Sequence, residues 1–342
     1  MIDADLIVAG AGPAGMATAL YAARAGMRVE VFEPRPGPID KACGEGLMPG
    51  AVRGLRELEV SLRGETIRGI RYTDGCRVVD AAFRNGPGLG VRRTTLQAAL
   101  MDAARLAGVK VVDSRVVDVH QDADGVSVEG RRARYLAVAD GLHSPIRRQL
   151  GLQRAAPATT PLRWGTRQHF AVAPWTDLVE VHWASRSEAY VTPVGPELVG
   201  VAVLSSVQAP FAQQLAAFPA LRDRLPDVGV TSVRGAGPLA QRTSARVAGR
   251  ALLVGDAAGY VDALTGEGIA VALACARALV DCVVAGDPGA YERRWLAESR
   301  RYRTITSTLL WARRQRILAP RIVPLAARSP RVFDLAVQQL AH

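Results

Sequence analysis

A glycine pattern near the N-terminus constrains the fold of this chain more than any other feature. Three glycines with the spacing Gly-x-Gly-x-x-Gly follow an apolar segment typical of a buried strand and precede a helical pattern. A second apolar segment ends just before Glu33, 23 residues after Gly10. Such glycines permit a tight turn and the close approach of a pyrophosphate to a helix N-terminus, and the acidic residue can accept hydrogen bonds from a ribose. The pattern predicts a dinucleotide site at Gly10, Gly12, Pro13, Ala14, Gly15 and Glu33.

The composition excludes several classes of protein. The chain has 342 residues, of which 49% are hydrophobic, so it can bury a large core and is not expected to be disordered. Its four cysteines form no Cys-x-x-Cys pair, which argues against a disulfide framework and against a zinc ribbon. We therefore expect no metal site, and we expect the reducing cytoplasm as the compartment.

The formal net charge of +11 is concentrated at the C-terminal end. Residues 291–342 contain eleven arginines against three acidic residues, a net charge of +8. No nucleic-acid-binding motif accompanies these arginines, so nucleic acid is not expected as a partner. Apolar residues and arginines alternate around Trp311 in an amphipathic pattern that would permit peripheral contact with a membrane.

Two kinds of sequence alternate along the chain. Strand–turn–helix pieces typical of a nucleotide-binding domain are interrupted by pieces in which one strand pattern follows another. The first kind comprises 1–58, 90–150 and 245–290, and the second comprises 60–90 and 155–240. This order predicts an α/β fold: a Rossmann-like domain with a β-rich substrate domain inserted twice, followed by a basic helical region at 291–342. We expect a long loop at 34–50 and breaks in the helical region at Pro320, Pro324 and Pro330.

Two further turns carry an acidic residue at the end of a strand. Asp256 precedes a run of small residues, where a carboxylate can bind the ribityl hydroxyls of a flavin. Asp140 lies in a second turn of this kind, and simple nicotinamide-dependent dehydrogenases need neither. The glycine turn and these two elements, in this order, resemble the FAD-dependent monooxygenase and geranylgeranyl-reductase superfamily of p-hydroxybenzoate hydroxylase-like flavoproteins. The resemblance extends from the N-terminus to about Val284.

The resemblance implies particular contacts with FAD. The glycine turn and Glu33 would hold the ADP half, with Arg93 against the cofactor and the backbone of Val116 against the adenine. Asp256 would bind the ribityl chain, and Asp140 would tie the sheet to the pyrophosphate region. Two more segments resemble the prenyl-reductase branch: residues 41–47, its Cys-Gly loop beside the isoalloxazine ring, and residues 264–269, its helix-opening turn at the N1/O2 edge of the flavin. They would contribute Lys41, Cys43, Gly44, Gly266, Gly268 and Ile269.

The residues chosen as candidates for acid–base or redox catalysis are Cys43, Glu45 and His182. Cys43 lies in the Cys-Gly loop, but it lacks a Cys-x-x-Cys partner, so it could equally fill space against the flavin. Glu45 is a candidate proton donor or a solvated loop carboxylate. His169 and His182 are the histidines of the strand-rich region, and His182 shares one strand face with Glu180. Either imidazole could deprotonate a phenol, or it could be a structural side chain satisfied by its neighbours.

The leading functional prediction is an FAD-dependent monooxygenase. It would hydroxylate a lipophilic phenol- or quinol-like natural product with O2, and NAD(P)H would bind transiently as the reductant. The alternative is a geranylgeranyl-reductase-like enzyme that saturates prenyl double bonds. A third hypothesis is a non-catalytic flavin-bound protein, or a membrane-surface partner that acts through residues 291–342.

Overall fold

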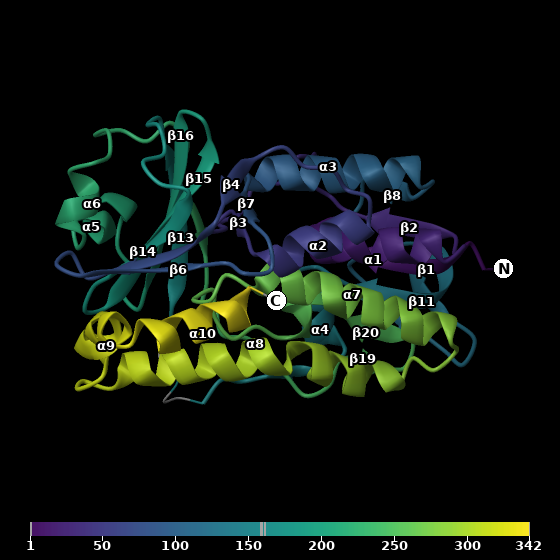
Figure 1. Ribbon diagram of the computed structural model, residues 1–342. Helices are drawn as coiled ribbons and strands as arrows, with labels where there is room; N and C mark the ends of the chain where they lie inside the picture. Colours follow the sequence, from purple (N-terminus) through teal and green to yellow (C-terminus); the bar gives the residue numbers. More distant parts are fainter. Residues whose placement is uncertain (1, 158–159, 161, 342) are drawn as a thin grey trace.

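The first domain is built on an eight-stranded sheet whose central strands are parallel (Figure 1). The computed structural model describes residues 2–157, 160 and 162–341 of the chain. The main strand order is β19-β20-β11-β1-β2-β8, and β10 and β9 extend from β11. The elements of this domain are β1 (Ala4–Ala9), α1 (Pro13–Arg24), β2 (Val29–Phe32), α2 (Pro49–Glu57), α3 (Arg93–Leu106), β8 (Lys110–Val112), β9 (Val119–Gln121), β10 (Val126–Val128), β11 (Arg131–Val138), α4 (Pro145–Gln149), β19 (Val247–Ala248), β20 (Ala251–Leu253), the 3-10 helix η1 (Gly255–Ala258) and α7 (Gly268–Val284).

The carboxyl ends of β1 and β20 carry the glycine turn and the Asp256 turn. The four residues of β2 are all buried, as expected for a strand with helices on both faces of its sheet. Because β1, β11 and β20 are neighbours and parallel, the turns that follow them lie at one edge of the sheet. The predicted α/β fold class with a Rossmann-like domain is therefore confirmed.

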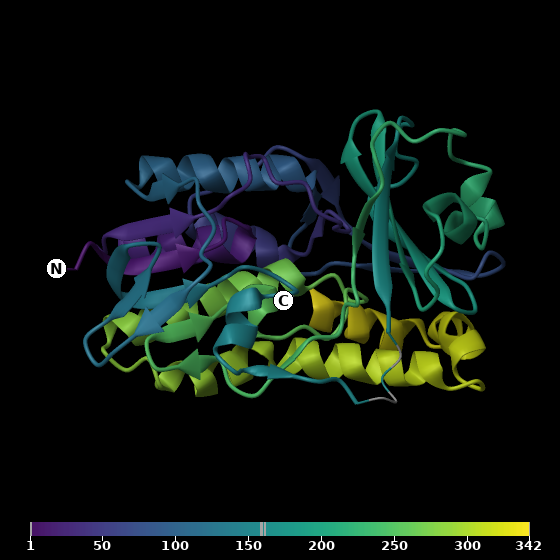
Figure 2. The ribbon, with the colours of Figure 1, turned by 180° about the vertical axis from the view of Figure 1, so that it is seen from behind.

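The second domain is a seven-stranded sheet that takes its strands from two parts of the chain (Figure 2). Its order is β17-β13-β16-β15-β14-β5-β6, and β5 and β6 form an antiparallel hairpin around Asp74 and Gly75. One face packs toward the first domain, and two short helices cover the other. The elements are β5 (Gly69–Thr73), β6 (Val78–Ala82), β13 (Trp164–Phe170), β14 (Leu178–Trp183), β15 (Ser187–Gly195), β16 (Leu198–Ser205), α5 (Phe211–Leu215), α6 (Pro219–Arg222) and β17 (Arg234–Ala236).

Small sheets join the two domains. One contains β3, β7 and β4, and the other pairs β12 with β18. The prediction of a continuous loop over 34–50 is wrong at its end, because Gly46 and Leu47 pair with β7 and α2 begins at Pro49, a residue well suited to the first helical turn. The joining strands are β3 (Gly46–Leu47), β4 (Glu65–Ile67), β7 (Gly88–Gly90), β12 (Gln153–Arg154) and β18 (Arg242–Thr243).

The C-terminal helices pack along both domains. Figure 1 shows α8 running beneath the first domain and continuing under the second. Its Trp295 belongs to the core of the first domain, and its Leu310 belongs to the core that faces the second sheet. Each such side chain contributes about 1.5–3 kcal/mol by leaving water, so this region is structural. It comprises α8 (Ala290–Arg314), η2 (Ala319–Arg321), α9 (Ile322–Arg328) and α10 (Pro330–Leu340).

The predicted break at Pro324 is wrong. Pro324 lies in the first turn of α9, where its missing N–H leaves no helical hydrogen bond unmade. Pro320 lies in η2, between α8 and α9, and Pro330 begins α10. No helix among the described residues is long and apolar enough to cross a membrane.

Candidate active site

The glycine turn packs backbone against backbone. Gly10 has φ of 105°, and a Cβ on it would lie 2.6 Å from the carbonyl oxygen of Ala139. A Cβ on Gly15 would lie 1.9 Å from the carbonyl oxygen of Gly10. Helix α1 begins immediately afterwards, with Gly12 as N-cap and Pro13 at its first position. Only glycine fits these contacts, and the turn leaves the N–H groups of the first helical turn available to an anion.

Glu33 lines a cavity of about 490 Å³ beside the glycine turn. It is 3% exposed and accepts a hydrogen bond of 3.0 Å from the Ala11 N–H, and Arg35 donates to it at 2.6 Å. Burial opposes ionisation, but these hydrogen bonds hold the pKa of Glu33 below its ordinary value. The predicted contact of the Val116 backbone with the adenine stays a prediction. Val116 is buried in the core of the domain, and Val111 is the valine that lines the cavity.

Three cations gather at the open end of the turn. Burial lowers the pKa of Lys41, and the positive charges of Arg35 and Arg93 lower it further. Arg93 lies near Gly12, with 3.8 Å between its guanidinium and the position of a Cβ on the glycine. Its buried Nε has no hydrogen-bond partner among the described residues. Cations this close repel one another, so the arrangement suits a ligand that carries more than one negative charge.

Asp256 and Asp140 lie close to this cluster. Burial raises the pKa of Asp256, against the opposing charges of Lys41 and Arg93. Burial also raises the pKa of Asp140, whose Oδ1 has no partner among the described residues. Fully buried Arg147 donates to the carbonyl oxygens of Asp256 at 3.3 Å and Ala257 at 3.0 Å, so it fixes the Asp256 turn from behind.

The N-terminus of α7 follows the Asp256 turn. Gly266 has φ of 70°, and α7 begins at Gly268, followed by Ile269. The N–H groups of this first turn have no partner within the helix, and the helix dipole adds positive potential there. Glu267, the N-cap, is 5% exposed, and burial raises its pKa to about 7. Its Oε2 has no partner among the described residues. Sequence reasoning missed this residue, because its burial depends on the packing of α8.

The Cys-Gly loop is fastened to the second sheet. The Thr192 hydroxyl donates to the carbonyl oxygen of Gly44 at 2.8 Å. Glu45 is buried at a φ of 61°, a left-handed conformation that costs energy and needs support. The Arg93 N–H donates to its Oε1 at 2.8 Å. Burial raises the pKa of Cys43 in the same loop, so the thiol keeps its proton.

His169 completes the support of Glu45. Its Nε2 lies 2.6 Å from Glu45 Oε2, and its Nδ1 lies 3.2 Å from a guanidinium nitrogen of Arg167. A guanidinium only donates, so Nδ1 accepts, and Nε2 carries the proton that it donates to Glu45. Arg167 also pairs with Asp40, and both His169 and Arg167 are at most 1% exposed. The hypothesis that Glu45 is a solvated loop carboxylate is therefore wrong.

His182 does not reach this site. In the β14–β15 register it lies opposite Ala189, and Glu180 lies opposite Val191. Ala189 and Val191 belong to the core under α5 and α6, on the sheet face that points away from the first domain. His182 Nε2 lies 3.2 Å from Glu180 Oε2, which confirms their shared face. The prediction of a catalytic His182 is corrected: of the two candidate histidines, His169 faces the site.

Comparison with known proteins identifies the family. Residues 3–285 match the family described as the FAD binding domain. The chain belongs to this family. It is an FAD-dependent oxidoreductase, as its relatives also indicate.

Two curated relatives and one solved structure show the extent of the similarity. Menaquinone reductase of Mycolicibacterium smegmatis is 30% identical over an alignment 380 residues long. The alignment covers 99% of this chain and 91% of that protein. Digeranylgeranylglycerophospholipid reductase of Methanothrix thermoacetophila is 28% identical, covering 85% of this chain and 82% of that protein. The structure of p-nitrophenol 4-monooxygenase from Pseudomonas putida has a TM-score of 0.82 at 18% identity, covering 99% of this chain and 98% of that chain. The structural similarity shows the shared fold.

The residues of the site fit FAD. The glycine cradle has no room for a Cβ, and buried Arg93 Nε and Asp140 Oδ1 are one donor and one acceptor without a partner in the described part of the chain. Lys41 and Arg35 add positive charge for the diphosphate, and Glu33 lines the cavity expected to hold the adenosine. The sequence resemblance named all of these residues except Arg35.

Proposed function

We propose that this flavoprotein reduces a carbon–carbon double bond in the polyprenyl chain of a lipid. The supporting observation is its 30% identity to menaquinone reductase over 99% of the chain. A second relative is named as acting on digeranylgeranylglycerophospholipid. Menaquinone and this phospholipid differ in their polar parts and share polyprenyl chains. The proposal therefore favours the reductase alternative over the hydroxylation expected first from the sequence.

The side chains of the site also favour reduction. Hydroxylation of a phenol is assisted by a base, but His182 faces away, and His169 is held in its hydrogen bonds to Glu45 and Arg167. Cys43 instead holds a proton at Sγ, where the Glu45 N–H approaches at 3.4 Å.

The proposed reduction balances with groups at this site. Reduced FAD, when bound, supplies a hydride to one carbon of the double bond. In our proposal the Cys43 thiol gives its proton to the other carbon and is reprotonated from solvent. NAD(P)H is the proposed source of the reducing equivalents.

An anaerobic turnover assay tests the proposed function. FAD-loaded protein, reduced by dithionite without oxygen, is mixed with menaquinone, and the product is analysed by mass spectrometry. We expect a gain of two hydrogen atoms in the polyprenyl chain. Cys43→Ser should keep FAD absorbance but lower turnover about tenfold or more, because a hydroxyl is a weaker proton donor.

The competing function is monooxygenation, which the shared fold with p-nitrophenol 4-monooxygenase keeps in view. It predicts no anaerobic product and incorporation of labelled O2 into a phenolic substrate. That pair of results would overturn the reductase proposal.

We also propose that the C-terminal helices touch an anionic membrane surface. Five apolar side chains in this basic region are each more than half exposed: Trp311, Ile317, Leu325, Val332 and Leu335. Exposed apolar side chains can insert into a membrane surface while neighbouring arginines contact anionic lipids. In vesicle sedimentation, the double variant Ile317→Ser, Leu325→Ser should bind phosphatidylglycerol vesicles several-fold more weakly than the wild type. Val228→Ser, an exposed site on the second domain, should bind unchanged; equal loss in both variants would refute the contact.

A further inference from the structure

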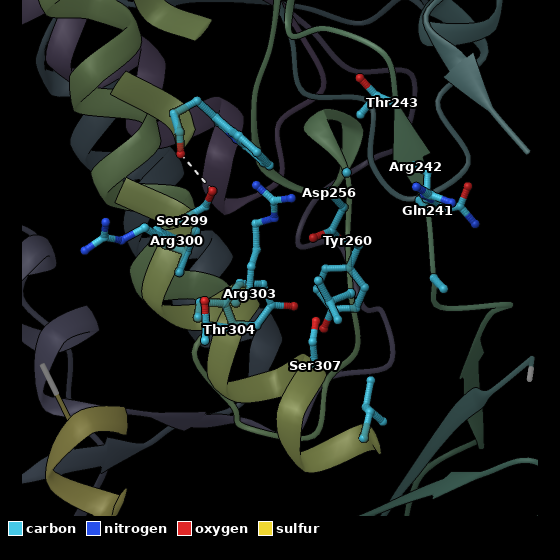
Figure 3. Close-up of a pocket in the computed structure, with 18 of the residues that line it drawn as sticks. Gln241, Arg242, Thr243, Asp256, Tyr260, Ser299, Arg300, Arg303, Thr304 and Ser307 are labelled. Atoms are coloured by element: carbon cyan, nitrogen blue, oxygen red, sulfur yellow. Dashed lines mark hydrogen bonds between the residues drawn. The ribbon is translucent and has the colours of Figure 1, made fainter. Parts of the chain in front are cut away.

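A second large cavity lies between α7, α8 and β18, with a volume of about 760 Å³ (Figure 3). It is separate from the cavity of about 490 Å³ that Glu33 lines, and the two cavities share no lining residue. One face of α7 forms an apolar wall that includes Val271 and Ala272. Figure 3 shows Arg303 reaching from α8 toward the loop that carries Tyr260, and Arg242 lies on the opposite wall. The cavity thus has an apolar wall and arginines on two sides.

Two arginines are held against the indole ring of Trp295 at this cavity. The guanidinium carbon of Arg246 lies 3.9 Å from the ring centre, and that of Arg303 lies 5.3 Å from it. Arg246 also pairs with Glu292 at 2.9 Å, so its charge is balanced. Arg303 forms no ion pair within the described part of the chain, and burial and the charge of Arg246 lower its pKa. A half-buried cation beside another cation is stabilised when an anion binds next to it.

The other polar groups at the cavity also favour a bound anion. Among the described residues that line the cavity, the carboxylate is Asp256, which already faces Lys41, Arg93 and Arg147. On α8, Ser307 follows Arg303 by one helical turn, so their side chains project on the same face. Arginine and serine donors in this arrangement match the oxygens of a phosphate group.

We propose that this cavity binds a phosphate- or diphosphate-bearing small molecule, with Arg303, Arg242 and Ser307 as its direct partners. Trp295 and Arg246 hold Arg303 in place from behind. The apolar wall of α7 is suited to an apolar group attached to the phosphate. The cavity borders the FAD site, because Asp256 and Gly268 also line it, but its proposed direct partners Arg303, Arg242 and Ser307 are not among the residues assigned to FAD. The proposal does not rest on the proposed reaction, because its test measures binding.

Isothermal titration of the FAD-loaded protein tests this site. FAD occupies the diphosphate site of the glycine turn, so added sodium pyrophosphate can report on the second cavity. We expect saturable binding that Arg303→Ala weakens about tenfold or more, because a charge-assisted hydrogen bond is lost. Arg294→Ala is the matched control: it removes the same charge from α8 at an exposed residue paired with Asp281, and it should bind like the wild type.

A second titration separates two sources of the phosphate. Dihexanoyl phosphatidic acid is compared with dihexanoyl phosphatidylcholine, below the concentrations at which either forms micelles. If pyrophosphate binding is weakened by Arg303→Ala, the ligand is a free phosphate or diphosphate. If only the phosphatidic acid binds in an Arg303-dependent manner, the ligand is a lipid headgroup. No saturable binding in either titration, or equal loss in Arg303→Ala and Arg294→Ala, would overturn the proposal. Flavin absorbance and circular dichroism verify that each variant is folded. Arg242→Ala is the second variant, and it tests the other arginine proposed as a direct partner.

Discussion

The candidate active site has two walls, one from each domain, and they differ in whether main chain or side chains form them. The wall from the first domain is mostly backbone: glycines that admit no Cβ and helix N-termini with free N–H groups. The wall from the second domain is a sheet face made of side chains. Its buried His169 and Arg167 bind Glu45 and Asp40, in and just before the Cys-Gly loop. A backbone wall can hold the invariant part of a cofactor, because its geometry depends on few side chains. A side-chain wall can change with the substrate while the cofactor stays in place.

The difference is also one of distance along the chain. The glycine turn is complete within six residues, Gly10 to Gly15, whereas the pair Glu45–His169 joins residues 124 positions apart. A local pattern forms wherever its segment folds. A long-range pair requires both domains to be docked first, so it depends on the stability of their interface.

The largest effect is expected from Gly15→Val in the backbone wall. A Cβ there would overlap the carbonyl oxygen of Gly10 at 1.9 Å, so the turn must open and lose its anion-binding geometry. We expect FAD affinity to fall by about a thousandfold, which corresponds to about 4 kcal/mol. The measurement is flavin absorbance of the purified protein, followed by titration with FAD.

Gly26→Ala is the control for this substitution. Gly26 also has a positive φ, of 80°, but a Cβ on it meets nothing within 4 Å. It should cost about 1 kcal/mol of stability and leave FAD binding intact. Yellow protein from Gly15→Val would show that the turn is not the cofactor cradle.

The second prediction concerns the interface that supports the side-chain wall. Buried Arg163 pairs with Glu188 at 2.7 Å and with Asp262 at 3.0 Å, joining the sheet to the segment before α7. Arg163→Ala should lower the free energy of unfolding by about 3 kcal/mol, because it leaves two buried carboxylates with less compensation. Urea unfolding followed by circular dichroism measures this loss.

An exposed ion pair on the same domain provides the contrast. Arg68 and Asp177 lie 3.1 Å apart, with side chains 71% and 54% exposed. Arg68→Ala should cost at most about 1 kcal/mol, because solvent screens the pair. Similar losses for Arg163→Ala and Arg68→Ala would remove the distinction between a buried network and surface charge.

The contrast between the walls explains which parts of the site could be predicted from sequence. The glycine turn and the start of α7 follow from local patterns of small residues at strand and helix ends, and the structure has both. Strand alternation correctly placed Glu180 and His182 on one face. A period of two cannot tell which face a neighbouring domain will cover, so the choice of His182 over His169 failed. The contact of the Val116 backbone with the adenine stays a prediction, because the burial of its side chain does not test it.

The third prediction tests how packing tunes a residue of the backbone wall. Burial raises the pKa of Glu267 from its ordinary value of 4.5 to about 7, so the folded protein binds its proton more tightly than the unfolded chain does. The stabilisation is complete below pH 4.5 and is lost as the pH rises to about 7, by up to about 3 kcal/mol. Urea unfolding at pH 5 and pH 8 measures the difference. Glu267→Gln should flatten the dependence, and an unchanged slope in this variant would exclude Glu267 as its source.

The smallest effect is expected from a matched pair of histidine substitutions on the two faces of the second sheet. His169→Leu leaves Glu45 Oε2 without its donor, so the strained loop can shift and misplace Cys43. We expect turnover to fall about tenfold while FAD is retained, because small displacements near reacting atoms are costly. His182→Leu, on the face covered by α5 and α6, should change stability but leave turnover per folded molecule within about twofold. Steady-state kcat, normalised to bound flavin, decides between the faces: a loss of kcat in His182→Leu alone would place the substrate on the far side of the sheet.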